Sequence, residues 1–333
     1  LSDSSPEKTI GQALGISLSD VRSFLASLNK LYEPSNAYHN FVHATDVLQA
    51  IYFFLVEVGA VPTLRRALLQ PENRNLWERR ATVVPGIVNA TQQFDVAHSP
   101  LQPADTLALL FAAVGHDAGH PGLSNAFLVN ADAAIAKAFD NKSPLENYHA
   151  LMLEQNLCKT GFEGAIWEGA EVERRRTDFG QLIRDCILAT DMSLHFGYVA
   201  AIDALQERVA AKDGAALRAM SREDITLLCC AMLKCSDICN PSREIGIGRQ
   251  WSINLRREWA LQMDLEMGCQ LPITVGCSTA TPRKASVGAD CAVLHQSCKI
   301  HETMVRRPSA AQAIASIGGG GGSGASASEQ GVR

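Results

Sequence analysis

The stretch VGHDAGHPGLSN, residues 114–125, closes an apolar helical run that starts at Leu107 and places His116, Asp117 and His120 in one short turn. Consecutive side chains on a helix point about 100° apart. His116 and Asp117 can therefore bind one metal ion while the second carboxylate oxygen reaches another. Packing alone explains such a turn poorly. It predicts part of a metal centre, for which other segments must supply further ligands.

Apolar residues with a helical period recur on both sides of this turn, and strand patterns are almost absent. The sequence therefore predicts an all-α fold, a compact multi-helix bundle. Ser143, Pro144 and Glu146 are expected to form a capping box at a helix start. The helices are expected after the cap Ser17, over 40–58, 107–114, 125–130, 132–139, from 143, and over 179–190, 195–212, 222–236 and 242–267.

Two segments break the helical pattern. Residues 59–103 are rich in Pro, Asn, Arg and Gln, which indicates an insertion with a short helix around 64–69. From residue 271 the chain turns to Thr, Ser, Ala and Gly, and a glycine run follows at 318–322. We expect one domain over 1–300, divergent over 271–300, and a disordered low-complexity tail over 301–333.

Composition limits the possible partners. The chain has 333 residues, 47% of them hydrophobic, and a net charge of −5, which suits a globular protein without a nucleic-acid face. Its densest basic run, Arg174–Arg176, follows Glu171 and Glu173 and is expected on a solvated helix face.

The ten cysteines include several in apolar helical runs and no CxxC pair. We interpret them as reduced thiols of a cytoplasmic protein. No apolar stretch reaches the roughly 18 residues of a membrane span, and no signal pattern opens the chain. Because it begins at Leu1, we expect a domain of a longer protein.

Further candidate ligands lie far from the central turn. His39 and His43 are four residues apart at the start of an apolar helix, so they share one face. Asp237 follows a long apolar helical run, where an unpaired carboxylate would be costly. A single histidine or acid is usually solvated or packed, but the set as a whole is harder to explain that way. The set is completed by His149, His120, Glu146 and Asp191.

Five motifs make a family resemblance specific: YHNFVHA (38–44), HDAGHPGLSN (116–125), SPLEN (143–147), ATDMS (189–193) and KCSDICNP (234–241). In this order, they resemble the catalytic domain of class I cyclic nucleotide phosphodiesterases, relatives of the HD-type phosphohydrolases, over residues 17–268. The resemblance implies that His43, His116, Asp117 and Asp237 hold Zn²⁺.

It also implies that Asp117 bridges to a second ion, Mg²⁺ or Mn²⁺, whose waters are held by His120, Glu146, Thr190 and Asp191. Two such ions can activate water and neutralise phosphate charge.

The same resemblance assigns a general acid and a base pocket. His39 matches the family's proton donor to the leaving 3′ oxygen, and Glu146 is expected to orient it. Asn240 matches a position that lines the purine site and favours cAMP over cGMP. The expected substrate-binding residues are Tyr38, Met192, Asn240, Trp251 and Leu255, with Glu258 in the same stretch.

Departures from the family pattern concentrate near the end of the domain. Ala118 replaces a larger apolar residue, and Tyr148 stands where a second histidine is common. The family closes its pocket with a motif like SQxGFI, and the matching stretch 284–290 places Ser286 and Ala289 at the purine-binding Gln and clamping Phe. Neither side chain can replace those contacts. Gln296 is one alternative clamp.

These observations lead to one main hypothesis and two alternatives. The main hypothesis is metal-dependent hydrolysis of a 3′,5′-cyclic nucleotide to the nucleoside 5′-monophosphate. One alternative is a weakly active or inactive domain that binds metal but lacks the purine clamp. The other is an HD-type phosphohydrolase that acts on a different phosphoester.

Overall fold

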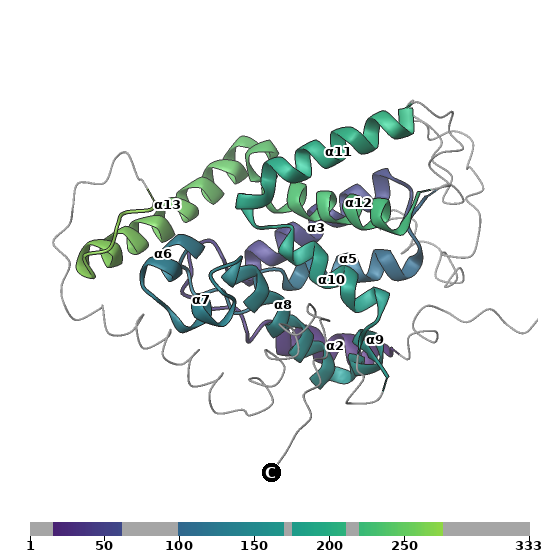
Figure 1. Cartoon of the computed structure of the whole chain (residues 1–333), viewed down its shortest axis with the longest axis horizontal. Helices are drawn as coiled ribbons and strands as arrows, with labels where there is room; N and C mark the ends of the chain where they lie inside the picture. The colour runs from purple at the N-terminus through teal and green to yellow at the C-terminus, as the bar shows by residue number, and fades with distance from the viewer. Residues whose placement is uncertain (1–15, 62–98, 170–174, 211–219, 276–333) are drawn as a thin grey trace, which may run out of the picture.

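A computed structural model of the chain describes residues 16–61, 99–169, 175–210 and 220–275, and helices form most of them (Figure 1). The only strands in these ranges are the short antiparallel pair β1 (Trp167–Glu168) and β2 (Arg175–Arg176). The helices are α2 (Leu18–Leu28), α3 (Phe41–Glu57), α5 (Pro103–Gly115), α6 (Asn125–Asn130), α7 (Ala134–Ala138), α8 (Pro144–Leu157), the π-helical turn η2 (Cys158–Phe162), α9 (Glu163–Ile166), α10 (Asp178–Leu188), the 3₁₀ turn η4 (Met192–Leu194), α11 (His195–Ala210), α12 (Arg222–Asp237), the 3₁₀ turn η6 (Asn240–Ser242) and α13 (Ile245–Gly268).

Helix α5 forms the centre of the bundle. It packs against α3 and α10, and most of its side chains are buried, including Leu109 and Phe111. Small alanines at 108, 112 and 113 allow the neighbouring helices to approach closely. Because α5 is apolar on nearly every side, it can only lie inside the protein, and its C-terminal end presents His116 within the bundle.

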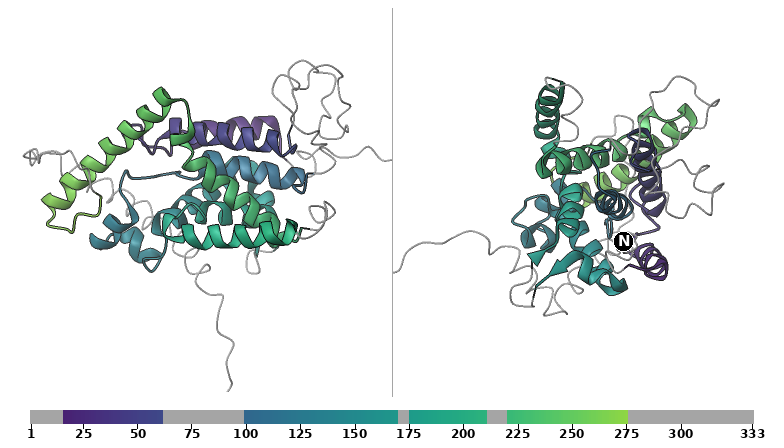
Figure 2. Two further views of the ribbon diagram at one scale, coloured as in Figure 1. Left: turned by 90° about the horizontal axis from the view of Figure 1, so that it is seen from above. Right: turned by 90° about the vertical axis from the view of Figure 1, so that its right-hand side faces the viewer.

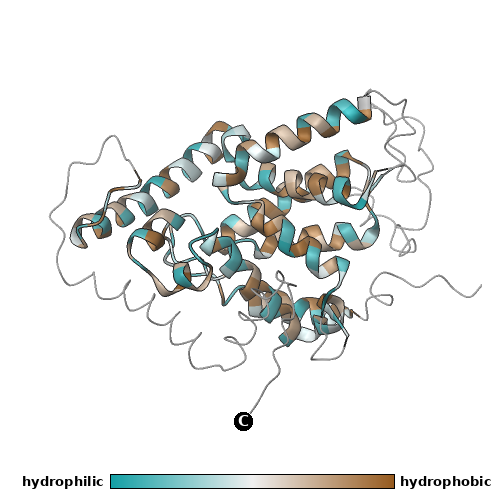
Figure 3. Ribbon diagram, viewed as in Figure 1, coloured by the Kyte–Doolittle hydropathy of each residue, from teal (hydrophilic) through white to brown (hydrophobic). Residues whose placement is uncertain are grey.

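The outer helices are amphipathic or polar. Figure 3 shows apolar ribbon concentrated where the central helices meet, whereas α11 and α13 alternate between apolar and polar positions. In Figures 1 and 2, α13 extends from the bundle as a long arm. Its polar side chains Glu258, Gln262 and Glu266 are nevertheless buried, and they lie on one face at helical spacing.

The all-α prediction is confirmed, and the predicted helices within the described ranges are present with bounds that differ by a few residues. The capping box at Ser17 is formed with Asp20. The predicted capping box at Ser143 is wrong. Ser143 has a left-handed backbone (φ 42°), and its hydroxyl donates to Asp191 Oδ2 (2.6 Å) instead of capping α8.

The prediction of a solvated helix face at Arg174–Arg176 is also wrong. Arg175 and Arg176 form strand β2, and Arg176 makes a bidentate ion pair with the buried Glu154. Pairing with strand β1 and an ion pair with Glu154, 22 residues away, override the local charge pattern. The short helix around 64–69, the tail 301–333, Ser286, Ala289 and Gln296 lie outside the described residues. No helix in the described ranges is long and apolar enough to span a membrane.

Gly180 provides a test of the packing around α10. A Cβ added there would lie 2.6 Å from the backbone carbonyl oxygen of Ile166. We expect the steric clash in Gly180→Ala to cost about 2 kcal/mol of folding free energy. This cost exceeds the gain of about 1 kcal/mol from the higher helix propensity of alanine, so the variant should be less stable. In α11, Gly197 has no atom within 4 Å of an added Cβ, so Gly197→Ala is the matched control. Thermal unfolding should give a lower melting temperature only for Gly180→Ala, and equal values would contradict this packing.

Candidate metal centre

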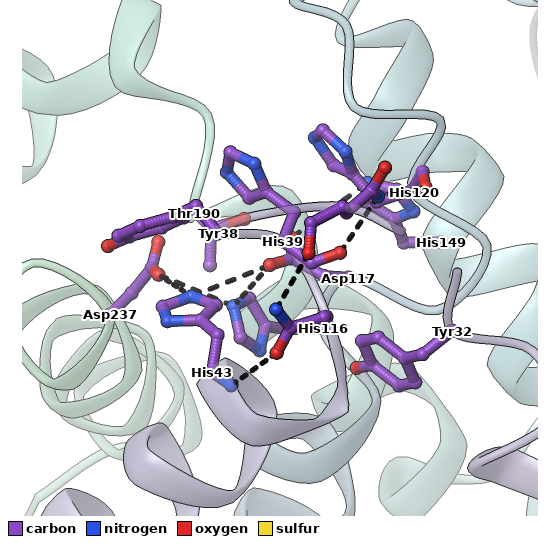
Figure 4. A network of polar contacts seen from close by, with 12 residues as sticks. Tyr32, Tyr38, His39, His43, His116, Asp117, His120, His149, Thr190 and Asp237 are labelled. Atoms are coloured by element: carbon purple, nitrogen blue, oxygen red, sulfur yellow. Dashed lines mark hydrogen bonds and ion pairs between the residues drawn. The ribbon is translucent and has the colours of Figure 1, made fainter. Parts of the chain in front are cut away.

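Four side chains from three distant segments meet at the inner end of the bundle (Figure 4). His43 comes from the first turn of α3, His116 and Asp117 from the end of α5, and Asp237 from the end of α12. Asp237 Oδ1 lies 3.0 Å from His43 Nε2 and 3.3 Å from His116 Nε2. Asp117 Oδ2 lies 3.1 Å from His116 Nε2. The structure therefore brings the four predicted ligands together.

The unmet hydrogen-bonding capacity of this cluster fits a metal ion. His116 Nε2 and Asp117 Oδ2 are buried, and neither has a hydrogen-bond partner. The two atoms are close to each other, but their relative orientation does not allow a hydrogen bond between them. The other ring nitrogen of His116, Nδ1, is held by the carbonyl oxygen of Ala113 (2.9 Å). That contact orients Nε2 toward the carboxylates, as is usual for metal-binding histidines. Two imidazoles and two carboxylates are a donor set that Zn²⁺ accepts.

The electrostatics of the cluster also call for a cation. Burial alone would raise the pKa of Asp117, yet His116 beside it lowers this pKa well below its ordinary value. Burial would lower the pKa of His116, but the charges of Asp117 and Asp237 raise it strongly. Without a metal, the mutual attraction between His116 and these carboxylates favours the charged form of each. A divalent ion would likewise stabilise the charged carboxylates.

A second group of ligand atoms adjoins the first through Asp117. Potential ligand atoms of Asp117, His120 and His149 lie within 4.8 Å of one another. His149 Nδ1 is held by the carbonyl oxygen of Ala118 (3.0 Å). Burial lowers the pKa of His149 to about 4 and that of His120 well below its ordinary value. Both rings are therefore neutral near pH 7 and can hold an ion or its water.

The acidic wall next to this group comes from α8 and the turn after α10. Asn125 Nδ2 donates to both carboxylate oxygens of Glu146 (3.1 and 2.9 Å). Burial raises the pKa of Glu146 to about 7. The ammonium of Lys234 donates to the carbonyl oxygens of Ala189 and Asp191 (both 3.0 Å), so it supports the turn that carries Thr190.

His39 stands over the cluster, and its partner is Glu258. The imidazole of His39 stacks on that of His120, with 3.9 Å between ring centroids, and its Nδ1 contacts Glu258 Oε1. Glu258 Oε2 also accepts the backbone N–H groups of Tyr38 (3.0 Å) and His39 (3.1 Å). The prediction that Glu146 orients His39 is therefore wrong, because Asn125 binds that carboxylate and α13 supplies the one that contacts His39.

A cavity of about 330 Å³ opens over these residues. Of the residues predicted for the base pocket, Met192 and Glu258 line it, and Tyr38, Asn240, Trp251 and Leu255 do not. Asn240 Nδ2 donates to the Tyr38 hydroxyl (2.5 Å), so its amide is bound by another residue outside the cavity lining. Trp251 and Leu255 lie on the N-terminal half of α13, before the stretch that reaches the cavity. Sequence reasoning gave no site role to the lining residues Ser124, Asn125, Trp259 and Gln262.

Some of these residues carried a usable signal. Asn125 closes the motif that contains the histidines, and Gln262 lies four residues after Glu258 on the same helical face. Gln262 Oε1 accepts the backbone N–H of Ser124 (2.7 Å), and its amide nitrogen donates to Glu266 Oε1 (2.8 Å). This polar connection attaches α13 to the segment that contains the turn with His116, Asp117 and His120.

Comparisons with known proteins agree with this geometry. Residues 38–290 match the family model described as 3′5′-cyclic nucleotide phosphodiesterase. The chain is 27% identical over 240 residues to the 3′,5′-cyclic-nucleotide phosphodiesterase regA of Dictyostelium discoideum, a match that covers 72% of this chain and 24% of that protein. It is 29% identical over 258 residues to the human high affinity cAMP-specific and IBMX-insensitive 3′,5′-cyclic phosphodiesterase 8A, covering 74% and 26% respectively.

The chain therefore spans about a quarter of the length of these curated relatives. Among solved structures, the crystal structure of yeast caPDE2 is 26% identical, with a TM-score of 0.59 over 87% of this chain and 52% of that one. The likeness thus extends from the motifs to the helical fold that positions them.

Proposed function

Because the chain belongs to the 3′5′-cyclic nucleotide phosphodiesterase family, we propose that it hydrolyses a 3′,5′-cyclic nucleotide to the nucleoside 5′-monophosphate. The observation that carries this proposal is that His43, His116, Asp117 and Asp237 converge beside a cavity that Asp117, Asp237 and His39 line. Metal ligands and a proton donor are the two groups that hydrolysis of a cyclic phosphodiester requires.

The proposed metals follow from the donor atoms. His43, His116, Asp117 and Asp237 would hold Zn²⁺, while Asp117, with water molecules held by His120, Glu146, Thr190 and Asp191, would hold Mg²⁺ or Mn²⁺. When bound, two divalent ions activate water and neutralise the negative charge of the phosphate. The buried unpartnered atoms His116 Nε2 and Asp117 Oδ2 support the first site.

The protein's own groups would handle the remaining proton. His39, protonated and held by Glu258, would donate a proton to the leaving 3′ oxygen as its bond to phosphorus breaks. The neutral rings of His120 and His149 would position water without adding positive charge. Glu146, held by Asn125, would be a hydrogen-bond partner for that water.

We propose cAMP as the preferred substrate, supported by the relative that is named as cAMP-specific. Tyr38, Asn240, Trp251 and Leu255 remain proposed contributors to substrate binding. A cytoplasmic setting is also proposed, supported by the seven cysteines of the described residues, all of them free.

The test is hydrolysis of cAMP and cGMP by the purified chain loaded with Zn²⁺ and Mg²⁺. Turnover of micromolar cAMP, faster than that of cGMP, is the expected result. A metal-loaded chain with negligible turnover would instead support a metal-binding domain without the purine clamp. Cleavage of simple aryl phosphodiesters but not of cyclic nucleotides would support a broader phosphohydrolase.

Glu258→Gln should shift the pH dependence of this reaction. Burial lowers the pKa of His39, but the hydrogen bond to Glu258, the charges of Asp117 and Asp237 and that of Glu258 itself outweigh this and raise it. A proton donor is active below its pKa, so a raised pKa extends activity to higher pH. Removing the Glu258 charge should therefore move the alkaline limb of the kcat profile to lower pH. Glu207→Gln makes the same change at an exposed glutamate of α11 outside the cavity lining and should leave the limb in place. An unmoved limb in Glu258→Gln would rule out this role.

A further inference from the structure

A second cavity, of about 640 Å³, lies between α10, α12 and the start of α11, helices that run side by side in Figures 1 and 2. None of its lining residues belongs to the metal cluster. Its inner wall is apolar and includes Leu182, Leu188, Leu227, the thiol of Cys230 and the ring of Tyr198. A cavity of this volume with an apolar wall and a few polar groups is typical of small-molecule sites.

Carboxylates dominate the polar edge of this cavity. Asp178, Asp185 and Glu223 line it, and Arg222 is the basic residue among the described lining residues. Arg222 is already neutralised, because its guanidinium forms an ion pair with the buried carboxylate of Asp105 (2.5 Å). Among the described residues none of these three carboxylates forms an ion pair, so the edge is acidic, with Arg184 and Arg176 acting on Asp185 from farther away.

Asp185 is the carboxylate best placed to bind a ligand. It lies in the middle of α10 and is half-buried, so it does not serve a helix terminus as Asp178 and Glu223 do. Its hydrogen-bond partner is the amide nitrogen of Gln181 (2.7 Å), and within the described ranges no cationic group lies within 4.0 Å of it. Burial raises its pKa. A cation beside Asp185 would stabilise its charged form.

We propose that this cavity is a second ligand site, which takes an organic cation with an apolar body. An ammonium group would pair with Asp185, and the apolar part would pack on Leu182, Leu188 and Tyr198. An organic anion of the same shape would meet three carboxylates and be rejected. Charge complementarity therefore selects this class of occupant over an acidic or neutral one.

A ligand in this cavity is expected to affect the metal centre, because the two cavities share a wall. Leu188 and Leu194 line the second cavity, while Thr190, Asp191 and Met192 between them line the first. Helix α12 likewise presents Cys230 to the second cavity and ends at Asp237. An occupant that moves this turn would change the metal-centre wall, a consequence that rests on the proposed function.

Binding can be tested with two probes that share a phenylalkyl body but carry head groups of opposite charge, 4-phenylbutylammonium and 4-phenylbutyrate. Ligand-observed NMR on the metal-loaded full chain measures their affinities. Leu227→Trp fills the cavity with a larger side chain. The binding that is seen in the wild type but lost in this variant is therefore binding in the cavity. We expect the affinity of the cavity to be at least roughly ten-fold higher for the ammonium than for the carboxylate. Asp185→Asn should lower the affinity for the ammonium by roughly ten-fold.

Asp203→Asn, which removes an exposed carboxylate of α11 outside the cavity, is the matched control and should bind the ammonium as the wild type does. Asp185→Asn preserves shape, so it keeps the test decisive if Leu227→Trp unfolds. Ammonium binding that is absent, equal to that of the anion, or unchanged in Asp185→Asn would overturn the proposal. These readouts do not depend on hydrolysis.

The link to the metal centre has its own measurement. At saturating 4-phenylbutylammonium, the KM or kcat for cyclic nucleotide hydrolysis should change at least two-fold in the wild type and stay constant in Asp185→Asn. Binding with unchanged kinetics would overturn the link but leave the binding site intact.

Discussion

Asp237→Ala is expected to abolish binding of the first metal ion and to lower the rate of cyclic nucleotide hydrolysis by roughly a thousand-fold or more. Asp237 Oδ1 lies close to both His43 Nε2 (3.0 Å) and His116 Nε2 (3.3 Å), so its removal takes away the carboxylate that joins the two imidazoles. Elemental analysis should show the loss of one metal equivalent per chain, and the loss of turnover should follow the loss of metal.

Asp203→Ala is the matched control, because this acid is exposed on α11, far along the sequence from the ligands. It should keep both its metal content and its rate. Adding excess Zn²⁺ to Asp237→Ala separates weakened binding from a lost site, since a weakened site regains some activity. Full activity of Asp237→Ala at the ordinary metal concentration would refute the ligand assignment.

His39→Ala should lower kcat by roughly a hundred- to ten-thousand-fold without changing metal content. His39 contacts Glu258 and stacks on His120. The ligand atoms of these three residues also lie within 4.8 Å of one another, but His39 is not in the group of His43, His116 and Asp237. Its loss removes the proton donor but leaves the cluster in place. Rates with cAMP and metal analysis of the same sample measure the two effects.

A substrate with a good leaving group distinguishes a proton donor from a structural residue. A p-nitrophenyl phosphodiester releases a stable anion that needs no proton, so His39→Ala should retain much more of its activity on that ester than on cAMP. His195→Ala, at the start of α11 outside the cavity lining, is the control and should lose neither activity. An equal loss on both substrates would assign His39 a structural role.

The helices of this protein can be predicted from its sequence to a greater extent than the contacts between distant side chains. Helix α5 was predictable because its residues are apolar on nearly every side, and helical period depends only on neighbours three or four residues away. Ser17 was predictable as a cap for the same reason, whereas Ser143 was not. The left-handed backbone of Ser143 turns its hydroxyl toward Asp191, 48 residues away.

The sequence by itself determined the kinds of candidate metal ligand and the helices that carry them, because ligand chemistry resides in side-chain types and helices form from local patterns. Only the tertiary structure decided which carboxylate reaches His39. Glu146 and Glu258 are equivalent acids in a sequence, but Asn125 binds one, and α13 brings the other to His39 across 219 residues. That choice depends on how α13 packs against the segment around Ser124, and no local pattern contains this information.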